Sequence, residues 1–319
     1  MSAVLSHATE AFLPPQADAP PQGFKIRPLP GAPLGAEVLG LDLSRPLGDA
    51  DFARLHRAHL DHHVVVFRDQ RITPRQHIDF SRRFGPLQIH VLKNFQLADH
   101  PEILVVSNIK DASGQPIGLG DAGHFWHSDL SYKERPSLGS LLHAQELPGE
   151  GGDTLFADQQ AAYQDLPHAL KQRIDPLLAV HHYGNRNDVD ESSRTAASVL
   201  STEQKARMPV ITHRIARPHP VTGRTCLYAV SGSSFGIVGM PDDEARDLLD
   251  ELAAHATQPK YQLRFTYGVG DIVVWDNAAL LHSATLIDPA DARTLWRITV
   301  LEPAPQAAAP AVLAPTFAA

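Results

Sequence analysis

The sequence is poor in the features that cross-link a chain or attach it to a membrane. It contains a single cysteine, Cys226, which excludes an internal disulfide and any cysteine-based zinc or iron–sulfur site. No apolar run approaches the roughly 18 residues that a membrane-spanning helix needs, and the first residues lack the basic start and apolar centre of a secretory signal. We therefore expect a cytoplasmic protein that makes no contact with a membrane.

Clustered positive charge is absent as well. The 28 Lys and Arg are outnumbered by 36 Asp and Glu, the formal net charge is −8, and no run of basic residues forms a stripe. A nucleic-acid partner is therefore not expected. Histidine, by contrast, is abundant, with 18 copies in 319 residues, and this abundance directs attention to histidine-based metal sites.

Composition also suggests how the chain is divided. Residues 1–22 and 303–319 are rich in Pro and Ala and poor in large apolar side chains, so both are predicted to be flexible tails. Residues 23–302 contain no internal repeat and no linker, and 43% of the chain is hydrophobic, which is enough for a sizeable core. We expect one domain over residues 23–302.

Short apolar runs separated by Gly and Pro dominate that domain. Helices are expected over 49–59, from Pro74 to Phe84 with Thr73 as the N-cap, and from about 241 to 256. Strands are expected at 63–67, 103–106, 140–143, 210–215, 226–230, 271–275 and 295–300. Many short strands with a few flanking helices favour a mainly β, jelly-roll architecture.

The segment Phe125–Asp129 carries the first candidate metal ligands. In an extended chain, residues i and i+2 point to the same side, so His127 and Asp129 can bind one ion from one short segment. Two His and one carboxylate on one face of an octahedron leave three positions open, which is the arrangement of non-haem Fe(II) oxygenases. Such a pair also arises by chance in a chain with so many histidines, so further ligands must support it.

The supporting residues lie near the end of the domain. Residues 270–277 are typical of a strand running into a turn, and His282 follows them. Arg293 and Arg297 are four apart on a predicted strand and therefore share one face. If that face is buried, two unpaired charges are costly, and anionic ligands would remove the cost. The alternative is that both Arg lie on the solvent face beside acidic residues of the preceding loop.

These stretches resemble the TauD/TfdA family, which includes taurine and 2,4-dichlorophenoxyacetate dioxygenases. The resemblance extends from about Phe24 to Leu301. It implies a double-stranded β-helix, a jelly roll of the clavaminate synthase-like type. The matching stretches are Leu34–Leu43, His63–Gln70, Arg83–Leu87, Trp126–Asp129, Glu146–Pro148, Gly151–Thr154 and Trp275–Asn277 followed by His282.

The resemblance implies an enzyme that uses Fe(II), 2-oxoglutarate and O2 and releases succinate and CO2. In this family His127, Asp129 and His282 would ligate the iron. Arg293, eleven residues after His282, would bind the distal carboxylate of 2-oxoglutarate, with the Thr154 hydroxyl beside it. The enzyme would hydroxylate a small anionic substrate, either a carboxylate such as an aryloxyalkanoate or an alkyl sulfonate or sulfate.

Two further residues match substrate positions of the family. Arg297 lies where members bind the acidic group of the substrate, and His90 matches a substrate-contacting His. The two are predicted to face each other across the iron. The inward neighbours of Arg297 on its strand, Leu295 and Thr299, carry no charge, so Arg297 needs either a second anion or a distant carboxylate partner.

Other histidines have no such match. His124 is predicted to be at most a residue of the pocket rim, and His181, His182 and His213 are predicted to be ordinary core or surface residues. The chain also departs from the taurine enzyme, because Gly123 replaces an Asn and Lys93 replaces a Tyr. The anion end of the site is kept and the amine end is not, so taurine is not the expected substrate. Residues 184–200 are expected to line or cover the pocket.

Two other functions use the same residues. Two His and a carboxylate also suit a zinc hydrolase, although this reading leaves Arg293 and Thr154 without a role. A jelly-roll binding protein that has lost its chemistry is the second alternative, against which the complete ligand set argues. Family members are commonly dimers or tetramers, so a homo-oligomer is expected.

Overall fold

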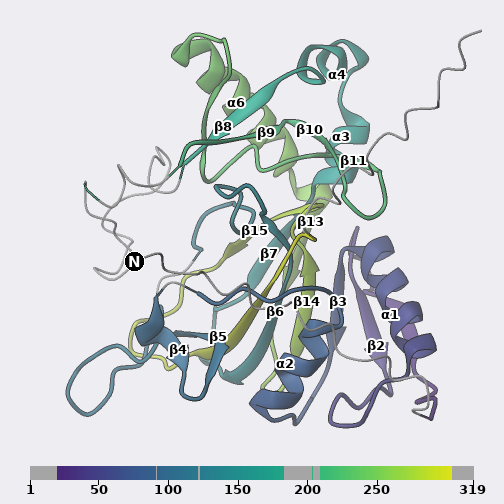
Figure 1. Ribbon diagram of the computed structural model, residues 1–319, viewed down its shortest axis with the longest axis vertical. Coiled ribbons are helices and arrows are strands. Elements are labelled where there is room, and N and C mark those ends of the chain that lie inside the picture. Colours follow the sequence, from purple (N-terminus) through teal and green to yellow (C-terminus); the bar gives the residue numbers. More distant parts are fainter. Residues whose placement is uncertain (1–19, 91, 121–122, 183–202, 204–208, 304–319) are drawn as a thin grey trace, which may run out of the picture.

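The computed structural model describes residues 20–90, 92–120, 123–182, 203 and 209–303 (Figure 1), so the segment 184–200 lies outside the described residues. An eight-stranded sheet with the order β1-β2-β3-β14-β6-β16-β5-β4 forms its base. Its neighbouring strands are antiparallel except for β2 and β3. The strands are β1 (Lys25–Pro28), β2 (Ala36–Leu39), β3 (Val64–Phe67), β4 (Gln96–Leu97), β5 (His100–Ser107), β6 (Ser137–Glu146), β14 (Ile272–Asp276) and β16 (Thr294–Leu301).

A three-stranded sheet with the order β13-β7-β15 faces the large sheet. Its strands are β7 (Thr154–Asp158), β13 (Gln262–Phe265) and β15 (Leu280–Ala284). Buried residues of both sheets pack into one cluster, in which Phe156 of the small sheet lies against Trp275 of the large one. This arrangement confirms the predicted jelly roll and places the interior between the two sheets.

Two helices cover the outer face of the large sheet (Figure 1). They are α1 (Asp49–His62) and α2 (Pro74–Arg82), and both contribute to a cluster with the outward side chains of β3 and β14. Thr73 caps α2 as predicted, but the helix ends at Arg82 rather than Phe84. His63 was expected in a strand and instead has a positive φ of 61°, because it is the residue that ends α1.

A third region lies beyond the small sheet and has its own core (Figure 1). It includes α6 (Asp242–Ala256), which matches the predicted helix, and two helices of only 7 residues that the sequence did not predict, α3 (Gln159–Asp165) and α4 (His168–Ile174). Its strands are β8 (Leu178–His181), β9 (Ile211–Arg214), β10 (Ala216–Pro218), β11 (Thr225–Leu227) and β12 (Ser234–Ile237). Short 3-10 turns in the described part of the chain are η1 (Lys93–Phe95) and η3 (Pro259–Tyr261). Among the described residues, no helix has both the length and the apolar character to cross a membrane.

Candidate active site

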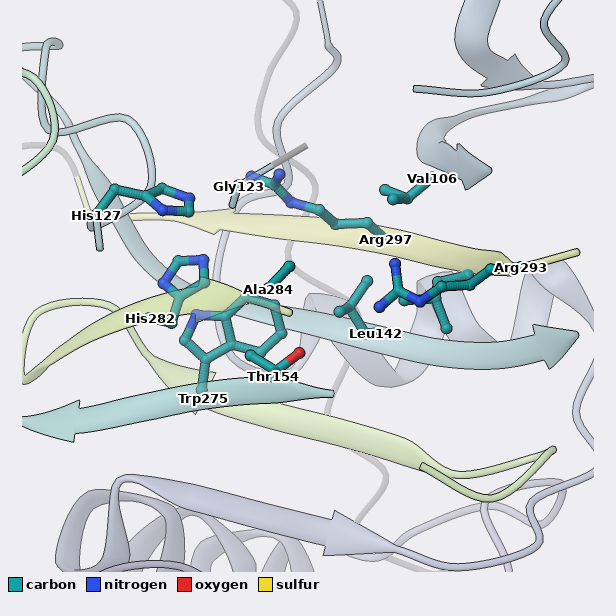
Figure 2. Close-up of a pocket in the computed structure, with 11 residues that line it drawn as sticks. Val106, Gly123, His127, Leu142, Thr154, Trp275, His282, Ala284, Arg293 and Arg297 are labelled. Atoms are coloured by element: carbon teal, nitrogen blue, oxygen red, sulfur yellow. The ribbon is translucent and has the colours of Figure 1, made fainter. Parts of the chain in front are cut away.

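The two predicted His ligands are paired directly through their backbones. His127 and His282 form an isolated antiparallel bridge, with N–H···O distances of 3.0 and 2.9 Å in the two directions. This bridge attaches the loop that carries His127 to β15, and it brings the two rings to a centroid separation of 4.2 Å. Figure 2 shows the two rings together at one end of the pocket.

Asp129 completes a compact group of three. Its Oδ1 lies 3.6 Å from His127 Nε2 and 3.8 Å from His282 Nε2. One potential ligand atom from each of the three residues lies within 4.8 Å of the others, and no other group of three or more His, Cys, Asp or Glu does so in the described part of the chain. A metal at about 2.0–2.2 Å from each atom fits this spacing.

The protonation of these groups also suits a cation. His127 Nδ1 lies 2.8 Å from the carbonyl of Phe125; since a carbonyl can only accept, Nδ1 carries the proton and Nε2 presents a lone pair. Burial holds the pKa of His282 well below its usual range, so this ring is neutral. Burial alone would raise the pKa of Asp129, but the charge of Arg297 holds it well below its usual range. The Nε2 lone pair of His127, the neutral ring of His282 and a carboxylate oxygen therefore converge.

The second oxygen of Asp129 is fixed by a network that the sequence did not predict. Ser140 Oγ donates to Asp129 Oδ2 at 2.6 Å, and Asn277 Nδ2 donates to Ser140 Oγ at 2.9 Å. Asn277 Oδ1 in turn accepts from Trp275 Nε1 at 3.0 Å. All four side chains are buried. The network leaves Oδ1 as the oxygen that faces the two histidines.

Two glycines form the wall behind His127. Gly123 has a φ of +82°, and a Cβ there would lie 2.9 Å from His127 Cε1. Gly232 has a φ of +85°, and its Cβ would lie 2.9 Å from that of His127. Contacts this short are not tolerated, so the absence of side chains at both positions lets the ring stand where it does. The Gly at 123, seen in the sequence only as a departure from the taurine enzyme, thus has a structural reason.

The opposite end of the pocket contains Arg293 and Thr154 (Figure 2). Arg293 is 8% exposed, donates from Nη2 to the carbonyl of Gly152 at 3.1 Å, and has no partner for Nε among the described residues. A Cβ on Gly152 would lie 3.0 Å from Arg293 Nε, so glycine makes room for the guanidinium. Thr154 Oγ1 lies 2.9 Å from the hydroxyl of Tyr267, a residue that the sequence did not indicate.

Arg297 lies between the two ends and has a carboxylate partner. The alternative of a solvent-facing pair of Arg is wrong, because both Arg293 and Arg297 line the pocket. The sequence left open a distant acidic partner for Arg297, and that partner is Asp129, with Arg297 Nη2 2.7 Å from Oδ1. Arg297 therefore does not require a second anion for neutralisation. The absence of a charged neighbour on its strand is then no longer a reason to expect a substrate anion there. Its Nε still has no hydrogen-bond partner within the described region.

His90 stands close to this charge without lining the pocket itself. Burial, together with the charges of Arg297 and Lys133, lowers the pKa of His90 to about 4. Its Nδ1 accepts from the backbone N–H of Leu92 at 3.1 Å, so the proton of the neutral ring is on Nε2 and is available to an acceptor.

The histidines without a predicted role stay outside the metal group. His124 Nδ1 lies 3.3 Å from the carbonyl of Ala284, and Ala284 lines the pocket. His181 and His213 stack edge-to-face with a centroid separation of 5.3 Å in the region of β8 and β9, and His182 is buried beside them.

The pocket itself is narrow and mostly apolar between its polar ends. It has an empty volume of about 450 Å³, including space open to solvent. It lies between the two sheets, and its apolar walls come from both. The lining residues other than His127, His282, Thr154, Arg293 and Arg297 are Val106, Gly123, Leu142, Trp275, Ala284 and Leu295.

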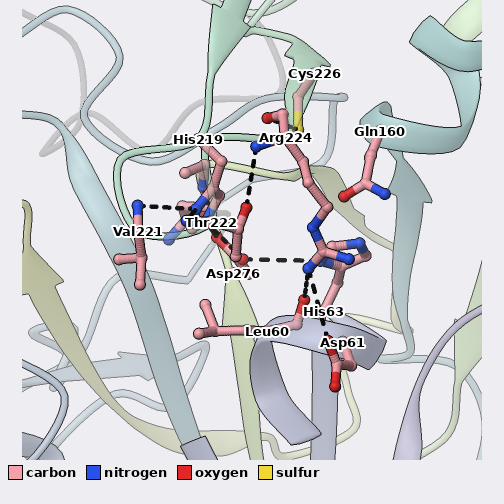
Figure 3. Close-up of polar contacts among 12 residues, drawn as sticks. Leu60, Asp61, His63, Gln160, His219, Val221, Thr222, Arg224, Cys226 and Asp276 are labelled. Carbon is pink, nitrogen blue, oxygen red and sulfur yellow. Dashed lines mark hydrogen bonds and ion pairs between the residues drawn. The ribbon is translucent and has the colours of Figure 1, made fainter. Parts of the chain in front are cut away.

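A second buried carboxylate lies at the end of β14 (Figure 3). Asp276 accepts from His219 Nε2 at 2.9 Å and lies 3.7 Å from His63 Nδ1. His219 Nδ1 accepts from the backbone N–H groups of Val221 and Thr222, both at 3.1 Å. The proton of His219 must therefore be on Nε2, where it is donated to Asp276. This cluster is closed by hydrogen bonds and needs no cation.

The comparisons with known proteins agree with this geometry. Residues 25–299 match the model of the family described as "Taurine catabolism dioxygenase TauD, TfdA family". The chain is 33% identical over 286 residues to pentalenolactone F synthase of Streptomyces arenae, with 86% of this chain and 94% of that protein covered. It is also 33% identical over 284 residues to the alpha-ketoglutarate-dependent 2,4-dichlorophenoxyacetate dioxygenase of Cupriavidus pinatubonensis, with 85% and 96% covered. A crystal structure of AAD-2 in complex with Mn(II) and N-oxalylglycine superimposes with a TM-score of 0.72 at 30% identity, covering 89% of this chain and 99% of that one.

Proposed function

This chain belongs to the TauD, TfdA family of dioxygenases, and on that premise we propose that it uses Fe(II), 2-oxoglutarate and O2 to hydroxylate a small anionic organic substrate. The observation that carries the proposal is the convergence of a ring nitrogen from each of two histidines and one carboxylate oxygen at one end of a pocket whose other end holds Arg293. The matched family and the relatives reported above are dioxygenases or carry synthase names, which supports neither the zinc hydrolase nor the non-catalytic binding protein.

His127, Asp129 and His282 would hold the iron on one face. When bound, iron and 2-oxoglutarate supply the oxidising chemistry, in which O2 converts 2-oxoglutarate to succinate and CO2 and the substrate gains a hydroxyl group. The chain's task is to orient the reactants and to exclude water. The bridge between His127 and His282, together with the Ser140 contact to Asp129, fixes the three ligands in advance.

Arg293 and Thr154 would bind the distal carboxylate of 2-oxoglutarate. Two features support this role: a buried guanidinium with an unused Nε–H, and a hydroxyl at the same end of the pocket. A carboxylate supplies the missing acceptor, and a charge-assisted pair of this kind is stronger than a neutral hydrogen bond. The depth of the pocket would then set the distance between this carboxylate and the metal.

Arg297 and His90 would bind the anionic group of the substrate. Arg297 has a free Nε–H beside the metal group, and His90 offers an Nε2 proton from a neutral ring. With a divalent metal in place, one carboxylate faces the metal and two guanidinium groups, so the site keeps a net positive charge that favours two anionic ligands. An aryloxyalkanoate is the first candidate, because one similar protein is named for 2,4-dichlorophenoxyacetate; alkyl sulfonates and sulfates remain in the same class. The predictions of a cytoplasmic location and of a dimer or tetramer are kept.

The test is succinate release and O2 consumption by the purified protein with a panel of aryloxyalkanoates, alkyl sulfonates and alkyl sulfates. We expect both to require Fe(II) and 2-oxoglutarate and to rise with the correct anion, whereas neutral ester analogues should be poor substrates. A protein that hydrolyses esters without consuming O2 would be the zinc hydrolase instead.

The two Arg roles are separated by substitution. Arg297→Gln should keep slow 2-oxoglutarate turnover and lose its stimulation by substrate, whereas Arg293→Ala should raise the 2-oxoglutarate requirement by about 100-fold, the size of a buried charge-assisted pair of about 3 kcal/mol. Arg75→Gln, at an arginine exposed on α2, is the matched control. If Arg293→Ala changed only the requirement for substrate, the two roles would have to be exchanged.

A further inference from the structure

Beyond the pocket wall, we propose that Tyr267 is a positioning residue for 2-oxoglutarate: its hydroxyl donates to Thr154 and so turns the Thr154 proton toward the distal carboxylate. The proposal rests on the proposed function, since it assigns a further residue to the same cosubstrate site. It names a group that neither the sequence nor the lining of the pocket reveals.

The fold places the two hydroxyls side by side. Thr154 begins β7 and pairs with Phe265 of β13, and Tyr267 follows Phe265 by two residues in the connection to β14. The two oxygens are 2.9 Å apart, and the residues are 3% and 9% exposed. Thr154 lines the pocket and Tyr267 does not, so the phenol lies behind the threonine as seen from the ligand.

Two hydroxyls share two protons, and only one arrangement uses both. If Thr154 donated to Tyr267, the phenol proton would have no acceptor, since no other hydrogen bond to that hydroxyl is found among the described residues. A buried donor without an acceptor costs free energy. If Tyr267 donates to Thr154, the phenol is satisfied and the Thr154 proton is left to point into the pocket. A carboxylate can only accept, so this is the arrangement that a carboxylate ligand requires.

The nearby Arg293 favours the same direction. Burial raises the pKa of Tyr267 to about 12, although the bond to Thr154 and the charge of Arg293 act in the opposite sense. The phenol therefore keeps its proton at any working pH. A cation close to the phenol attracts its oxygen lone pairs and repels its proton, so the O–H is not directed at Arg293, and Thr154 is the acceptor that remains among the described residues.

The test compares two ligands that differ only at the distal end. Binding of 2-oxoglutarate and of 2-oxopentanoate, which has a methyl group in place of the distal carboxylate, is measured by calorimetry on the Fe(II)-loaded enzyme without oxygen. Tyr267→Phe should weaken 2-oxoglutarate binding by roughly three- to tenfold, the range of one neutral hydrogen bond, and leave 2-oxopentanoate binding within twofold. In a Thr154→Val background, Tyr267→Phe should have no further effect.

The control is Tyr261→Phe, which removes another buried hydroxyl, one that donates to Asp165 away from the pocket. It should leave both affinities unchanged. If the Tyr267→Phe variant bound 2-oxoglutarate like the wild type, or bound both ligands more weakly by the same factor, the proposed role of Tyr267 in orienting the Thr154 proton would be overturned. Wild-type protein that failed to bind 2-oxoglutarate at all would instead overturn the proposed function.

A measurement on the wild type covers the case in which Tyr267→Phe does not fold. The tyrosine Cζ atoms are labelled with ¹³C and the protein is loaded with diamagnetic Zn(II). The Tyr267 resonance should then shift when 2-oxoglutarate binds, because the hydrogen bond from Tyr267 to Thr154 strengthens. It should move little with 2-oxopentanoate. Equal shifts with both ligands would contradict the proposed role of Tyr267.

Discussion

Two buried carboxylates in this molecule have similar histidine neighbours, but one belongs to a hydrogen-bonded structural cluster and the other to the candidate metal site. Asp129 and Asp276 are both buried, and each lies close to two histidines. At Asp276 the neighbouring His219 receives backbone N–H groups on Nδ1 and so points its proton at the carboxylate. At Asp129 the neighbouring His127 gives its Nδ1 proton to a carbonyl and so points a lone pair at the carboxylate.

The backbone around each ring therefore decides the function of the side chain. Where an N–H faces Nδ1, the His and the carboxylate complete each other and form a closed structural cluster. Where a carbonyl faces Nδ1, the same pair of residues presents a lone pair beside a carboxylate oxygen and can bind a metal. Residue types alone do not distinguish the two cases.

Removing a metal ligand should have the largest effect. Asp129→Ala, His127→Ala or His282→Ala should each reduce Fe(II) affinity and turnover by about 1,000-fold or more, which exceeds the 10–100-fold cost of losing an outer-shell partner. Metal content and succinate release after gel filtration measure both. His124→Ala, three residues before His127 and outside the metal group, should behave like the wild type. Full activity in any of the three variants would remove that residue from the ligand set.

Asp276→Ala should show the opposite profile. It leaves the His219 proton and the backbone N–H of Ala278 without their acceptor, and breaking a buried pair costs about 3–5 kcal/mol of unfolding free energy. Urea unfolding of the metal-free protein measures the loss. Fe(II) affinity of the folded fraction should stay within about twofold. Equal losses of metal affinity in the Asp129 and Asp276 variants would show that Asp276 is not purely structural.

Buried histidines without a carboxylate should make the protein sensitive to acid. Burial lowers the pKa of His77 to about 3 and that of His59 to about 4, below the ordinary value of 6.5. Each ring is neutral in the folded state, so its contribution to stability is complete above pH 6.5 and is lost as pH falls below it, by about 2 kcal/mol per ring at pH 5. Burial alone would lower the pKa of His63, but the nearby carboxylates of Asp276 and Asp158 raise it, so this ring contributes with the opposite sign.

Urea unfolding at pH 7 and pH 5 tests this sign. His77→Leu should reduce the loss between the two pH values by about 2 kcal/mol, because one proton uptake by the unfolded chain is removed. The exposed His168 offers the control, and His168→Leu should leave the pH dependence as it is. The same dependence in all three proteins would mean that His77 is protonated in the folded state.

The smallest effect is expected from the hydroxyl that holds Asp129. Ser140→Ala removes the 2.6 Å bond to Oδ2 and should weaken Fe(II) binding by about tenfold with little change in stability. Ser137→Ala is a close control, because the Ser137 hydroxyl accepts from Asn277 without contacting the Asp129 carboxylate, and its backbone N–H bond to the Asp129 carbonyl is kept in the variant. Titration with Fe(II) in the absence of oxygen compares the two. If both variants lost affinity equally, the effect would come from the network as a whole and not from the orientation of Asp129.

Most of the fold and the pair of His127 and Asp129 could be predicted from local periodicity and a short spacing, whereas His282 was assigned through the resemblance to the family. An i, i+2 pair such as His127 and Asp129 shares a side by geometry, and so do Arg293 and Arg297. The same reasoning shows which face a side chain is on and not which residue meets it there. The partner of Arg297 was therefore missed, since Asp129 comes from a loop far away in the chain.

The hydroxyl groups that support the site show the same limit of prediction from sequence. Ser140 is a fully buried polar residue directly before the apolar pair Leu141 and Leu142, and that position was a usable signal. Tyr267 offered none, because the connection that holds it has no periodicity and its contact with Thr154 spans 113 residues. Short helices such as α3 and α4 were missed because two turns are too few to produce a pattern.

Three consecutive residues, Trp275, Asp276 and Asn277, each serve a different neighbourhood. The indole forms a wall of the pocket, the carboxylate closes the His219 cluster, and the amide supports Ser140. A redesign of this enzyme for a new substrate should leave these three residues unchanged, because each supports a different site and they are adjacent in the chain. Libraries aimed at pocket shape are better directed to the apolar lining residues, whose side chains make no hydrogen bonds and otherwise only pack in the core between the sheets: Val106, Leu142 and Leu295.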